Sequence, residues 1–384
     1  MEDRTAIRTL HLLPELKEGG LERCVVEKVI WLQKHGIWAG VVSAGGIWAD
    51  RLTKGGVEHF VLPIHRKDPV SILRCASSVR KIIREQDIHL VCAHSRAPAW
   101  AAHLATRRRG HHEPPLITEA EGYYERYWYS NVMCWGDRVI AVSGVIRDYM
   151  VESLGADRNR TVVIPKGLAP DEFPEPEPQA RERLRDEWGI PDDAALVIGV
   201  GRLTHTKGWD DLIEAIAKMS PPRPYLVLVG TSHGRRRRYM SRLRDLIGAN
   251  ALDRQVIFAG HRDDMANVYA AADVVASPSR WPEPFGRVVI ESLILGRPVV
   301  TTEGCGAAEF LGDEFRRFIV PVRNPQALAD RLTETLSDQV GARAAVEVIS
   351  ERIRSDLTLD RQMSATLDVY RECRPDLPWP AAAS

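Results

Sequence analysis

The stretch that decides the fold runs from Asp273 to Glu309 and reads DVVASPSRWPEPFGRVVIESLILGRPVVTTEGCGAAE. A short apolar run ends in a polar turn with two prolines, and a helical pattern follows the turn. This pattern stops at Gly296, with Pro298 beyond it, and a second β-branched run comes next. A strand, a helix and another strand in this order indicate a βα unit of a parallel sheet.

The same alternation continues in both directions and predicts an α/β chain of two doubly wound, Rossmann-like units with parallel sheets. The expected strands are Arg8–Leu13, Trp38–Ser43, His59–Leu62, Leu90–Ala93, Leu116–Thr118, Asp137–Ala141, Thr161–Ile164, Leu196–Val200, Tyr225–Val229, Gln255–Phe258, Asp273–Ala276, Pro298–Thr301 and Arg317–Val320. The expected helices include Glu22–Lys34, Val70–Glu85, Trp209–Met219, Tyr239–Ala249, Met265–Ala271, Arg287–Leu295, Pro325–Ser337 and Gly341–Cys373.

One segment interrupts the alternation. Four prolines and four acidic residues fall among the nine residues from Pro170 to Pro178, which favours a stiff, exposed connector. We therefore predict a first domain over 1–170, a linker over 171–190 and a second domain over 191–350. The remainder, 351–384, is expected to be a C-terminal helix that packs back on the first domain, followed by a tail.

Size and composition narrow the class of protein. The chain has 384 residues, enough for two hydrophobic cores, and Lys+Arg and Asp+Glu are equal at 52 each. This balance argues against nucleic acid as a partner, and no apolar run approaches the ~18 residues that a transmembrane helix needs. The six cysteines are scattered without a CxxC pair, so we expect reduced thiols and a cytoplasmic protein.

A glycine-rich turn, GVGRLTHTKG, follows the expected strand that ends at Val200. Ligands bind at this edge of a doubly wound sheet. The third glycine of a dinucleotide-binding GxGxxG motif is missing, because Thr204 occupies its place. Arg202 and Lys207 flank the turn, and a guanidinium with an ammonium suits a diphosphate. A turn with two solvated basic residues is the alternative.

Two carboxylates lie in the opening stretch, Glu283 in the turn and Glu291 in the helix, with seven residues between them. A carboxylate accepts hydrogen bonds from paired hydroxyls, and the amides at a helix start suit a phosphate. This element could therefore hold a ligand that carries sugar hydroxyls beside a phosphate.

The first half has two comparable elements. Gly19 and Gly20 precede a helix, where they could let backbone amides approach an anion or form only a flexible turn. His94, Ser95 and Arg96 follow an expected strand at its carboxyl end. The histidine there is either functional or a hydrogen-bonded structural residue.

Acidic residues follow the neighbouring strand Leu116–Thr118. Glu119 and Glu121, with Tyr123 beyond them, are expected at the same edge of the sheet. Two acids there could do acid–base work or hold hydroxyls, and a solvated loop is the alternative.

The chain contains no Asp-x-Asp, the carboxylate pair that commonly holds a metal–diphosphate. Diphosphate charge would then be met by Arg202, Lys207 and helix termini. We therefore expect no metal and no cofactor.

Two arginine-rich runs form local positive patches: Arg235–Arg238 with Arg242 and Arg244, and Arg107–Arg109 with His111 and His112. Most such runs are solvated faces. The alternative is weak peripheral contact with an anionic lipid head group, or with a phosphorylated acceptor.

Taken together, these motifs resemble glycosyltransferase family 4, the retaining nucleotide-sugar transferases of GT-B fold. The second half carries the resemblance most specifically, in Gly201-Arg202-Leu203, Lys207-Gly208, the run from Glu283 to Glu291, Gly296-x-Pro298 and Glu309. Four runs of the first half resemble proteobacterial members associated with lipopolysaccharide or capsule assembly: Gly19–Arg23, Ala93–Trp100, Arg138–Ser143 and Ile164–Gly167. The resemblance implies two Rossmann-like domains whose sheets face a central cleft.

The resemblance also implies a role for each matching residue. Arg202 and Lys207 would neutralise the donor diphosphate. Glu291 would bind the ribose hydroxyls, and Glu283 the sugar hydroxyls. The leaving phosphate would assist deprotonation of the acceptor on the same face, which retains the anomeric configuration.

Backbone amides complete the implied donor site. Those at Gly19 and Gly20 in the first domain, and at Phe285 and Gly286 in the second, would touch the sugar and the phosphates. Fixed donors and cations of this kind stabilise the charge that develops on a departing diphosphate.

The implied acceptor side comprises His94, Ser95, Arg96, Glu121 and Tyr123. Relatives commonly have Thr-x-His-Gly after the corresponding strand, and here Glu121 stands in place of the histidine. An acid beside a leaving diphosphate would repel it unless the acid is protonated or paired. Glu121 would then face a cationic group, take a different catalytic role or mark weakened activity.

We therefore predict a cytoplasmic, metal-independent, retaining glycosyltransferase of the hexosyltransferase type. Its donor would be a nucleotide diphosphate-sugar, and its acceptor a glycan, lipid-linked or small-molecule hydroxyl. Synthesis of cell-envelope polysaccharide or lipopolysaccharide is the expected setting, with peripheral contact at the inner membrane as an option. The alternatives are a nucleotide-sugar epimerase, a nicotinamide-dependent dehydrogenase and a catalytically weak partner that binds a nucleotide sugar.

Overall fold

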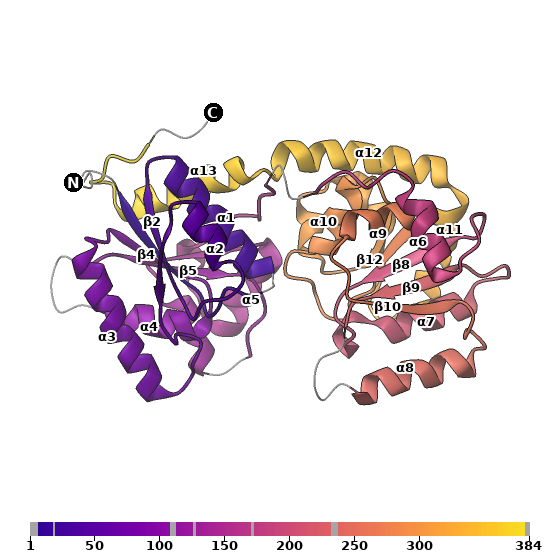
Figure 1. Cartoon of the computed structure of the whole chain (residues 1–384), viewed down its shortest axis with the longest axis horizontal. Coiled ribbons are helices and arrows are strands. Elements are labelled where there is room, and N and C mark those ends of the chain that lie inside the picture. The colour runs from indigo at the N-terminus through magenta and orange to yellow at the C-terminus, as the bar shows by residue number, and fades with distance from the viewer. Residues whose placement is uncertain are drawn as a thin grey trace. The chain divides into compact units, whose positions relative to one another are not determined.

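The computed structural model describes residues 7–17, 20–107, 113–125, 128–169, 173–231 and 237–380. The chain divides into two compact units, each with its own parallel sheet (Figure 1). Unit 1 comprises Met1–Ala169 and Leu357–Ser384, and unit 2 comprises Pro170–Asp356. The chain therefore leaves unit 1 once, builds unit 2 without interruption and then returns.

Unit 1 has a seven-stranded sheet in the order β3-β2-β1-β4-β5-β6-β7, with every pair parallel. Its strands are β1 (Arg8–Leu12), β2 (Trp38–Ser43), β3 (Glu58–Val61), β4 (Leu90–Ala93), β5 (Leu116–Ala120), β6 (Arg138–Ala141) and β7 (Thr161–Val163). Its helices are α1 (Gly20–Lys34), α2 (Ala49–Lys54), α3 (Pro69–Glu85), α4 (Arg96–Thr106), α5 (Gly144–Leu154) and α13 (Leu359–Cys373), with short 3₁₀ turns η1 (Trp128–Cys134) and η2 (Arg158–Arg160). The strand order reverses between β1 and β4, and doubly wound sheets bind ligands at such a switch point.

Unit 2 has a six-stranded parallel sheet in the order β10-β9-β8-β11-β12-β13. Its strands are β8 (Leu196–Val200), β9 (Tyr225–Val229), β10 (Val256–Gly260), β11 (Val274–Ser277), β12 (Val299–Thr302) and β13 (Ile319–Val320). Its helices are α6 (Ala180–Trp188), α7 (Trp209–Lys218), α8 (Arg237–Ala249), α9 (Met265–Ala271), α10 (Arg287–Ile294), α11 (Pro325–Ser337) and α12 (Gln339–Asp356), with 3₁₀ turns η3 (His205–Lys207), η5 (Gly306–Glu309) and η6 (Asp313–Phe318). The switch point of this sheet lies between β8 and β11.

Helix α13 packs on unit 1, although it lies at the far end of the sequence (Figure 1). Met363, Leu367 and Tyr370 are buried in the same hydrophobic cluster as Leu90 of β4. The hydroxyl of Tyr370 also lies 3.1 Å from the sulfur of Cys92 in that strand. The last helix therefore closes the core of the first unit.

The predicted linker 171–190 extends too far, because its second half forms α6. The helix formers of ARERLRDEW follow the proline-rich run, and Leu184 and Arg185 are fully buried. The guanidinium of Arg185 is held 2.9 Å from Oδ2 of Asp273, so a charged residue anchors this helix to unit 2.

The long helix predicted over Gly341–Cys373 is two helices, α12 and α13. The break falls at Thr358, whose side chain accepts a hydrogen bond of 3.1 Å from the amide of Arg361 and so caps α13. The predicted C-terminal segment, 351–384, therefore begins inside α12. Its first residues, up to Asp356, belong to unit 2.

Candidate functional site

Two loops of unit 2 leave the sheet at its switch point: residues 201–208 after β8, and residues 278–286 after β11. The amide of Arg280 donates to the carbonyl of Thr206 at 2.9 Å and ties the loops together. Gly208 has a φ of 72°, and a Cβ at this position would collide with the carbonyl of Pro278. Glycine is therefore required for the two loops to approach this closely.

Lys207 and Glu283, one from each loop, form an ion pair. The ammonium of Lys207 and the hydroxyl of Ser279 both donate to Oε1 of Glu283. Lys207 is 21% exposed and Glu283 is 17% exposed, so a ligand can reach both. The structure thus brings together the cation predicted for the diphosphate and the carboxylate predicted for the sugar.

A second ionic cluster fixes the β11 loop and was missed by the sequence analysis. Arg280 lies 2.8 Å from Oδ2 of Asp210 and 2.6 Å from Oδ2 of Asp211. Both acids are buried in the first turn of α7, and Tyr239 also donates to Asp210 at 3.1 Å. The sequence shows two acids at the start of a helix, a favourable position for negative charge. It does not show that Arg280, about 70 residues further along the chain, is their partner.

Glu291 lies on α10, which starts after Gly286 at a φ of 88°. Its carboxylate accepts from Nε of Arg287 at 2.6 Å and from the hydroxyl of Tyr269 at 2.8 Å. Burial, with a contribution from Glu291, raises the pKa of Tyr269 well above its ordinary value, so this hydroxyl stays protonated. Phe285, just before the helix, is buried. The carboxylate is thus held in one orientation.

Arg202 differs from Lys207, Glu283 and Glu291 because its side chain is exposed. Its carbonyl accepts from the indole of Trp209 at 2.9 Å, which fixes the backbone. In the part of the chain that the structure describes, no acid is ion-paired with its guanidinium. Arg202 is therefore a cation available to an anionic ligand.

In unit 1, His94 and Glu119 belong to a buried network, and the expected position of Glu119 is corrected. Glu119 is not a loop residue but the fourth residue of β5, and Lys28 of α1 lies 2.7 and 2.5 Å from its two oxygens. Nδ1 of His94 is 3.5 Å from Glu119, and its Nε2 is 3.2 Å from Nδ1 of His11. All four side chains are buried. Both ring nitrogens of His94 therefore face protein groups. This geometry fits the second of the two predicted roles, a hydrogen-bonded structural histidine.

Electrostatics within this network favour an ion pair flanked by a neutral histidine. Burial alone would raise the pKa of Glu119, but Lys28 and His94 outweigh it and hold that pKa well below its ordinary value. Burial, with His94 and Lys28 adding to it, holds the pKa of His11 well below its ordinary value. The sequence analysis missed Lys28, since a lysine inside an amphipathic helix gives no sign of burial.

Glu121, the residue that departs from the family pattern, is paired. The ammonium of Lys166 donates to its Oε2, and both side chains are 17% exposed. Burial, together with the charge of Glu121, raises the pKa of nearby Glu22. An acid beside a leaving diphosphate must be either protonated or paired. Glu121 is paired, because the ammonium of Lys166 compensates its charge.

The remaining first-half residues are placed as follows. Gly19 lies outside the described residues, and Gly20 begins α1. Ser95 precedes α4 without capping it through its side chain. Arg96 lies over the ring of Tyr124 and 3.5 Å from Glu125, and Tyr123 packs edge-to-face on Tyr149 at 4.8 Å.

His94, Glu119 and Glu121 also form a group of metal-ligand type, with one potential ligand atom from each lying within 4.8 Å of the others. Lys28 and Lys166 already contact the two carboxylates. An ammonium group therefore already compensates the charge of each carboxylate.

The arginine-rich runs are only partly described. Residues 108–112 and 232–236 lie outside the described ranges, so Arg108, Arg109, His111, His112, Arg235 and Arg236 cannot be placed. Arg242 lies 3.4 Å from the buried Asp210, which ties one exposed arginine to unit 2. Among the described helices, none has the length and apolar character needed to cross a membrane.

Comparisons with known proteins agree with these two units. Residues 18–172 match the family described as Glycosyltransferase Family 4, and residues 180–354 match the family described as Glycosyl transferases group 1. A D-inositol 3-phosphate glycosyltransferase from Xylanimonas cellulosilytica is 32% identical over 247 residues. That match covers 63% of this chain, which spans only 58% of the relative's length.

Solved structures extend the comparison to almost the whole chain. A glycosyltransferase from Rickettsia africae superposes with a TM-score of 0.84 and 27% identity, over 96% of this chain and 98% of that one. HepE from Anabaena, solved with UDP and glucose, gives a TM-score of 0.80 over 95% of this chain and 100% of its own. At 22% identity, HepE shows the fold alone.

The fold is thus GT-B, with two Rossmann-like units of parallel sheet. The chain belongs to the glycosyltransferases in which a family 4 first half is followed by a group 1 second half. It is therefore a member of a family of transferase enzymes.

Proposed function

We propose that this chain is a retaining glycosyltransferase that moves a sugar from a nucleotide diphosphate-sugar to a hydroxyl acceptor. The observation that carries the proposal is the Lys207–Glu283 ion pair at the switch point of unit 2. The same loops and the helix that follows them present Arg202 and Glu291. Two cations for a diphosphate and two carboxylates for hydroxyls are the groups that such a donor requires.

In the proposed reaction the acceptor oxygen forms a bond to the anomeric carbon, and the bond from that carbon to the diphosphate breaks on the same face. The proton of the acceptor hydroxyl moves to the departing phosphate oxygen. Arg202 and Lys207 stabilise the charge on the diphosphate, which is the largest electrostatic demand of the step. Lys207 is held by Glu283 before the charge develops, and the backbone of Arg202 is held by the indole of Trp209.

We further propose that the reaction needs no metal ion. The chain has no Asp-x-Asp, and the two carboxylates of the unit 1 cluster are bound by lysines. The acceptor is proposed to be a glycan, a lipid-linked precursor or a small molecule that approaches unit 1 near Glu121 and Tyr123. Because Lys166 compensates Glu121, the glutamate is compatible with turnover and does not by itself indicate an inactive protein.

The proposal is tested by incubating the full chain with UDP-, GDP- and ADP-sugars, with and without a cell-envelope extract as acceptor. UDP-sugars come first because HepE, a protein of the same fold, is described with UDP and glucose. Release of nucleoside diphosphate together with a glycosylated product supports transfer. A changed sugar without any acceptor would identify an epimerase, and binding without turnover would identify a partner protein.

A further inference from the structure

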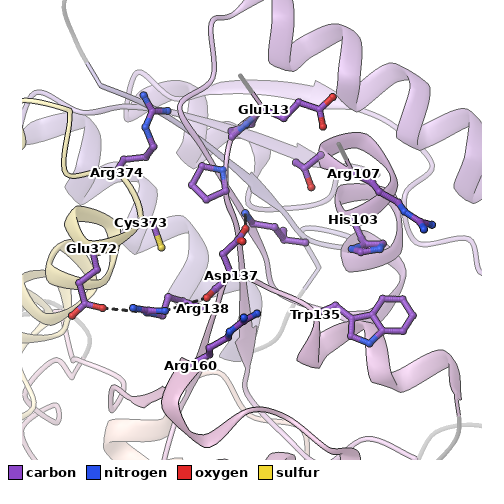
Figure 2. A pocket seen from close by; sticks show the side chains of 14 residues that line it. His103, Arg107, Glu113, Trp135, Asp137, Arg138, Arg160, Glu372, Cys373 and Arg374 are labelled. Atoms are coloured by element: carbon purple, nitrogen blue, oxygen red, sulfur yellow. Dashed lines mark hydrogen bonds and ion pairs between the residues drawn. The ribbon is translucent and has the colours of Figure 1, made fainter. Parts of the chain in front are cut away.

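Unit 1 contains a cavity of about 740 Å³ that the proposed reaction does not use (Figure 2). Leu116 and Arg138, the first residues of β5 and β6, line it, and Arg160 directly precedes β7. The cavity therefore lies at the amino ends of the strands. Glu121 and His94 follow the carboxyl ends of strands in the same sheet, so the two places are at opposite edges.

The walls come from three parts of unit 1. Figure 2 shows His103 and Arg107 from the end of α4 with Trp135 on one side, and Glu372 and Cys373 of α13 on the other, with Asp137 and Arg138 between them. The volume is within the ~300–1,000 Å³ of typical small-molecule sites. A ligand of two or three sugar rings is of this size class.

Three of the four arginines that line the cavity are paired with carboxylates, which argues against a site built for phosphate. Arg138 lies 3.1 Å from Glu372, Arg160 lies 3.5 Å from Asp157, and Arg374 lies 2.8 and 2.7 Å from Asp376. Guanidiniums that already hold carboxylates remain hydrogen-bond donors but supply little net positive field. Donors and acceptors that alternate around a cavity suit a polyhydroxylated, uncharged ligand, because each hydroxyl both donates and accepts.

Two observations point to an occupant. Oε2 of Glu113 is buried and accepts no hydrogen bond from any described residue, which is costly unless a ligand or water supplies a donor. Trp135 lines the cavity and is 46% exposed; its ring packs edge-to-face against Trp100 at 5.1 Å and at a tilted angle against His103 at 5.0 Å. A fixed, exposed indole presents an electron-rich face to the polarised C–H groups of a sugar ring.

We propose that this cavity is a noncatalytic binding site for an oligosaccharide. One sugar ring stacks on Trp135, and its hydroxyls donate to Glu113 and accept from Arg107 or Arg138. The site would hold a part of a glycan that does not react, and it is independent of the donor residues of unit 2.

The test is an array of neutral and acidic bacterial oligosaccharides probed with the labelled full chain, followed by titration of the best-bound oligosaccharide. We expect Trp135→Ala to weaken binding about tenfold or more, and the nearly isosteric Glu113→Gln to weaken it less. Trp128→Ala is the matched control, because Trp128 packs on Trp100 in the same aromatic cluster, is 71% exposed and does not line the cavity. Lys207→Ala should bind the oligosaccharide as the wild type does, and Trp135→Ala should retain protection by the nucleotide sugar.

Three results would overturn the proposal. The first is that no oligosaccharide on the array binds. The second is that binding survives both Trp135→Ala and Glu113→Gln. The third is that inorganic phosphate displaces the oligosaccharide at equal concentration, which would make the cavity an anion site. Lys207→Ala tests the donor site of unit 2 separately. If this variant loses protection by the nucleotide sugar but still binds the oligosaccharide, the two sites are independent, as proposed.

Discussion

The ammonium of Lys207 donates to Oε1 of Glu283, although the two residues are 76 positions apart in the chain. This contact joins the loop that follows β8 to the loop that follows β11, at the point where the strand order of unit 2 reverses. A donor diphosphate would compete with Glu283 for the ammonium, and a sugar hydroxyl would compete with Lys207 for the carboxylate. Without a bound donor, the ion pair therefore keeps the ammonium of Lys207 and the carboxylate of Glu283 in position.

Lys207→Met is expected to lower kcat/KM for transfer by about 10²–10³, because it removes a fixed cation from the departing diphosphate. Transfer kinetics with the best nucleotide sugar measure this loss. Lys218→Met, at the end of α7 in the same unit, is the matched control and should have wild-type kinetics. Equal activity of both variants would contradict a role for Lys207 in binding the donor diphosphate.

Arg202→Gln is expected to weaken donor binding while leaving the free energy of unfolding within about 0.5 kcal/mol of wild type. The reason is that Arg202 is exposed and pairs with no acid in the described part of the chain. Arg202→Lys should recover only part of the affinity, because an ammonium lacks the planar fork that grips a phosphate. Calorimetric titration and urea unfolding measure the two quantities; a large loss of stability would contradict this role.

Lys28→Met should destabilise the protein by about 3–5 kcal/mol, because it leaves Glu119 buried without its cation. The double variant Lys28→Met/Glu119→Leu should recover most of that loss, since a buried pair can be replaced by apolar side chains at little cost. Urea unfolding of the single and double variants measures the effect. If the double variant is no more stable than the single one, the pair has a role other than mutual compensation.

Acidification should destabilise the protein as the pH falls below 6.5. The pKa of His11 is lowered in the folded protein from an ordinary value of 6.5, so its contribution to stability is complete above 6.5 and is lost as the unfolded state gains a proton below it. Burial likewise lowers the pKa of His59, His89 and His103, which act in the same direction. Glu119 adds a later loss, because its lowered pKa affects stability only below 4.5.

Melting temperature measured from pH 8 to pH 5 tests this dependence. His11→Gln should reduce the slope below pH 6.5, and His65→Gln, a substitution at an exposed histidine, should leave it unchanged. A wild-type melting temperature that stays constant over this range would show that these histidines do not differ between the folded and unfolded states.

Chelation by EDTA should leave transfer unchanged, since arginine and lysine meet the diphosphate charge in the proposed site. The measurement is the transfer rate before and after dialysis against EDTA, with Mg²⁺ or Mn²⁺ added back. A rate that collapses and is restored by either ion would show that the donor is bound through a metal.

Much of the fold was predictable because most strands of both sheets are short apolar runs with buried side chains on both faces; β3, with no buried residue, is an exception. The predicted strands Leu90–Ala93, Leu196–Val200 and Tyr225–Val229 coincide with β4, β8 and β9. The break between α12 and α13 was not predicted, since helical periodicity passes through Leu357 and only the capping by Thr358 reveals the end. α6 was not predicted either, because the prolines before it dominate the local composition.

The site was predictable where its chemistry is local in the sequence. Arg202, Lys207 and Glu283 stand out because they lie in loops that follow strands, and Glu291 because it lies in the helix directly after one of these loops; their roles stay predictions. The ion pairs between distant segments were not predictable: Lys28 with Glu119, Lys166 with Glu121, and Arg280 with Asp211. A single sequence gives no information on which opposite charges meet across 45 to 91 positions.

The most direct test of the central claim is a thermal-shift titration of the full chain with nucleotide diphosphate-sugars, repeated for Lys207→Ala and Glu283→Ala. Ligand that binds only the folded state raises the melting temperature by mass action. We predict that at least one nucleotide sugar stabilises the wild type and that both substitutions abolish the shift. Absence of any shift across UDP-, GDP- and ADP-sugars, or an undiminished shift in both variants, would contradict the claim.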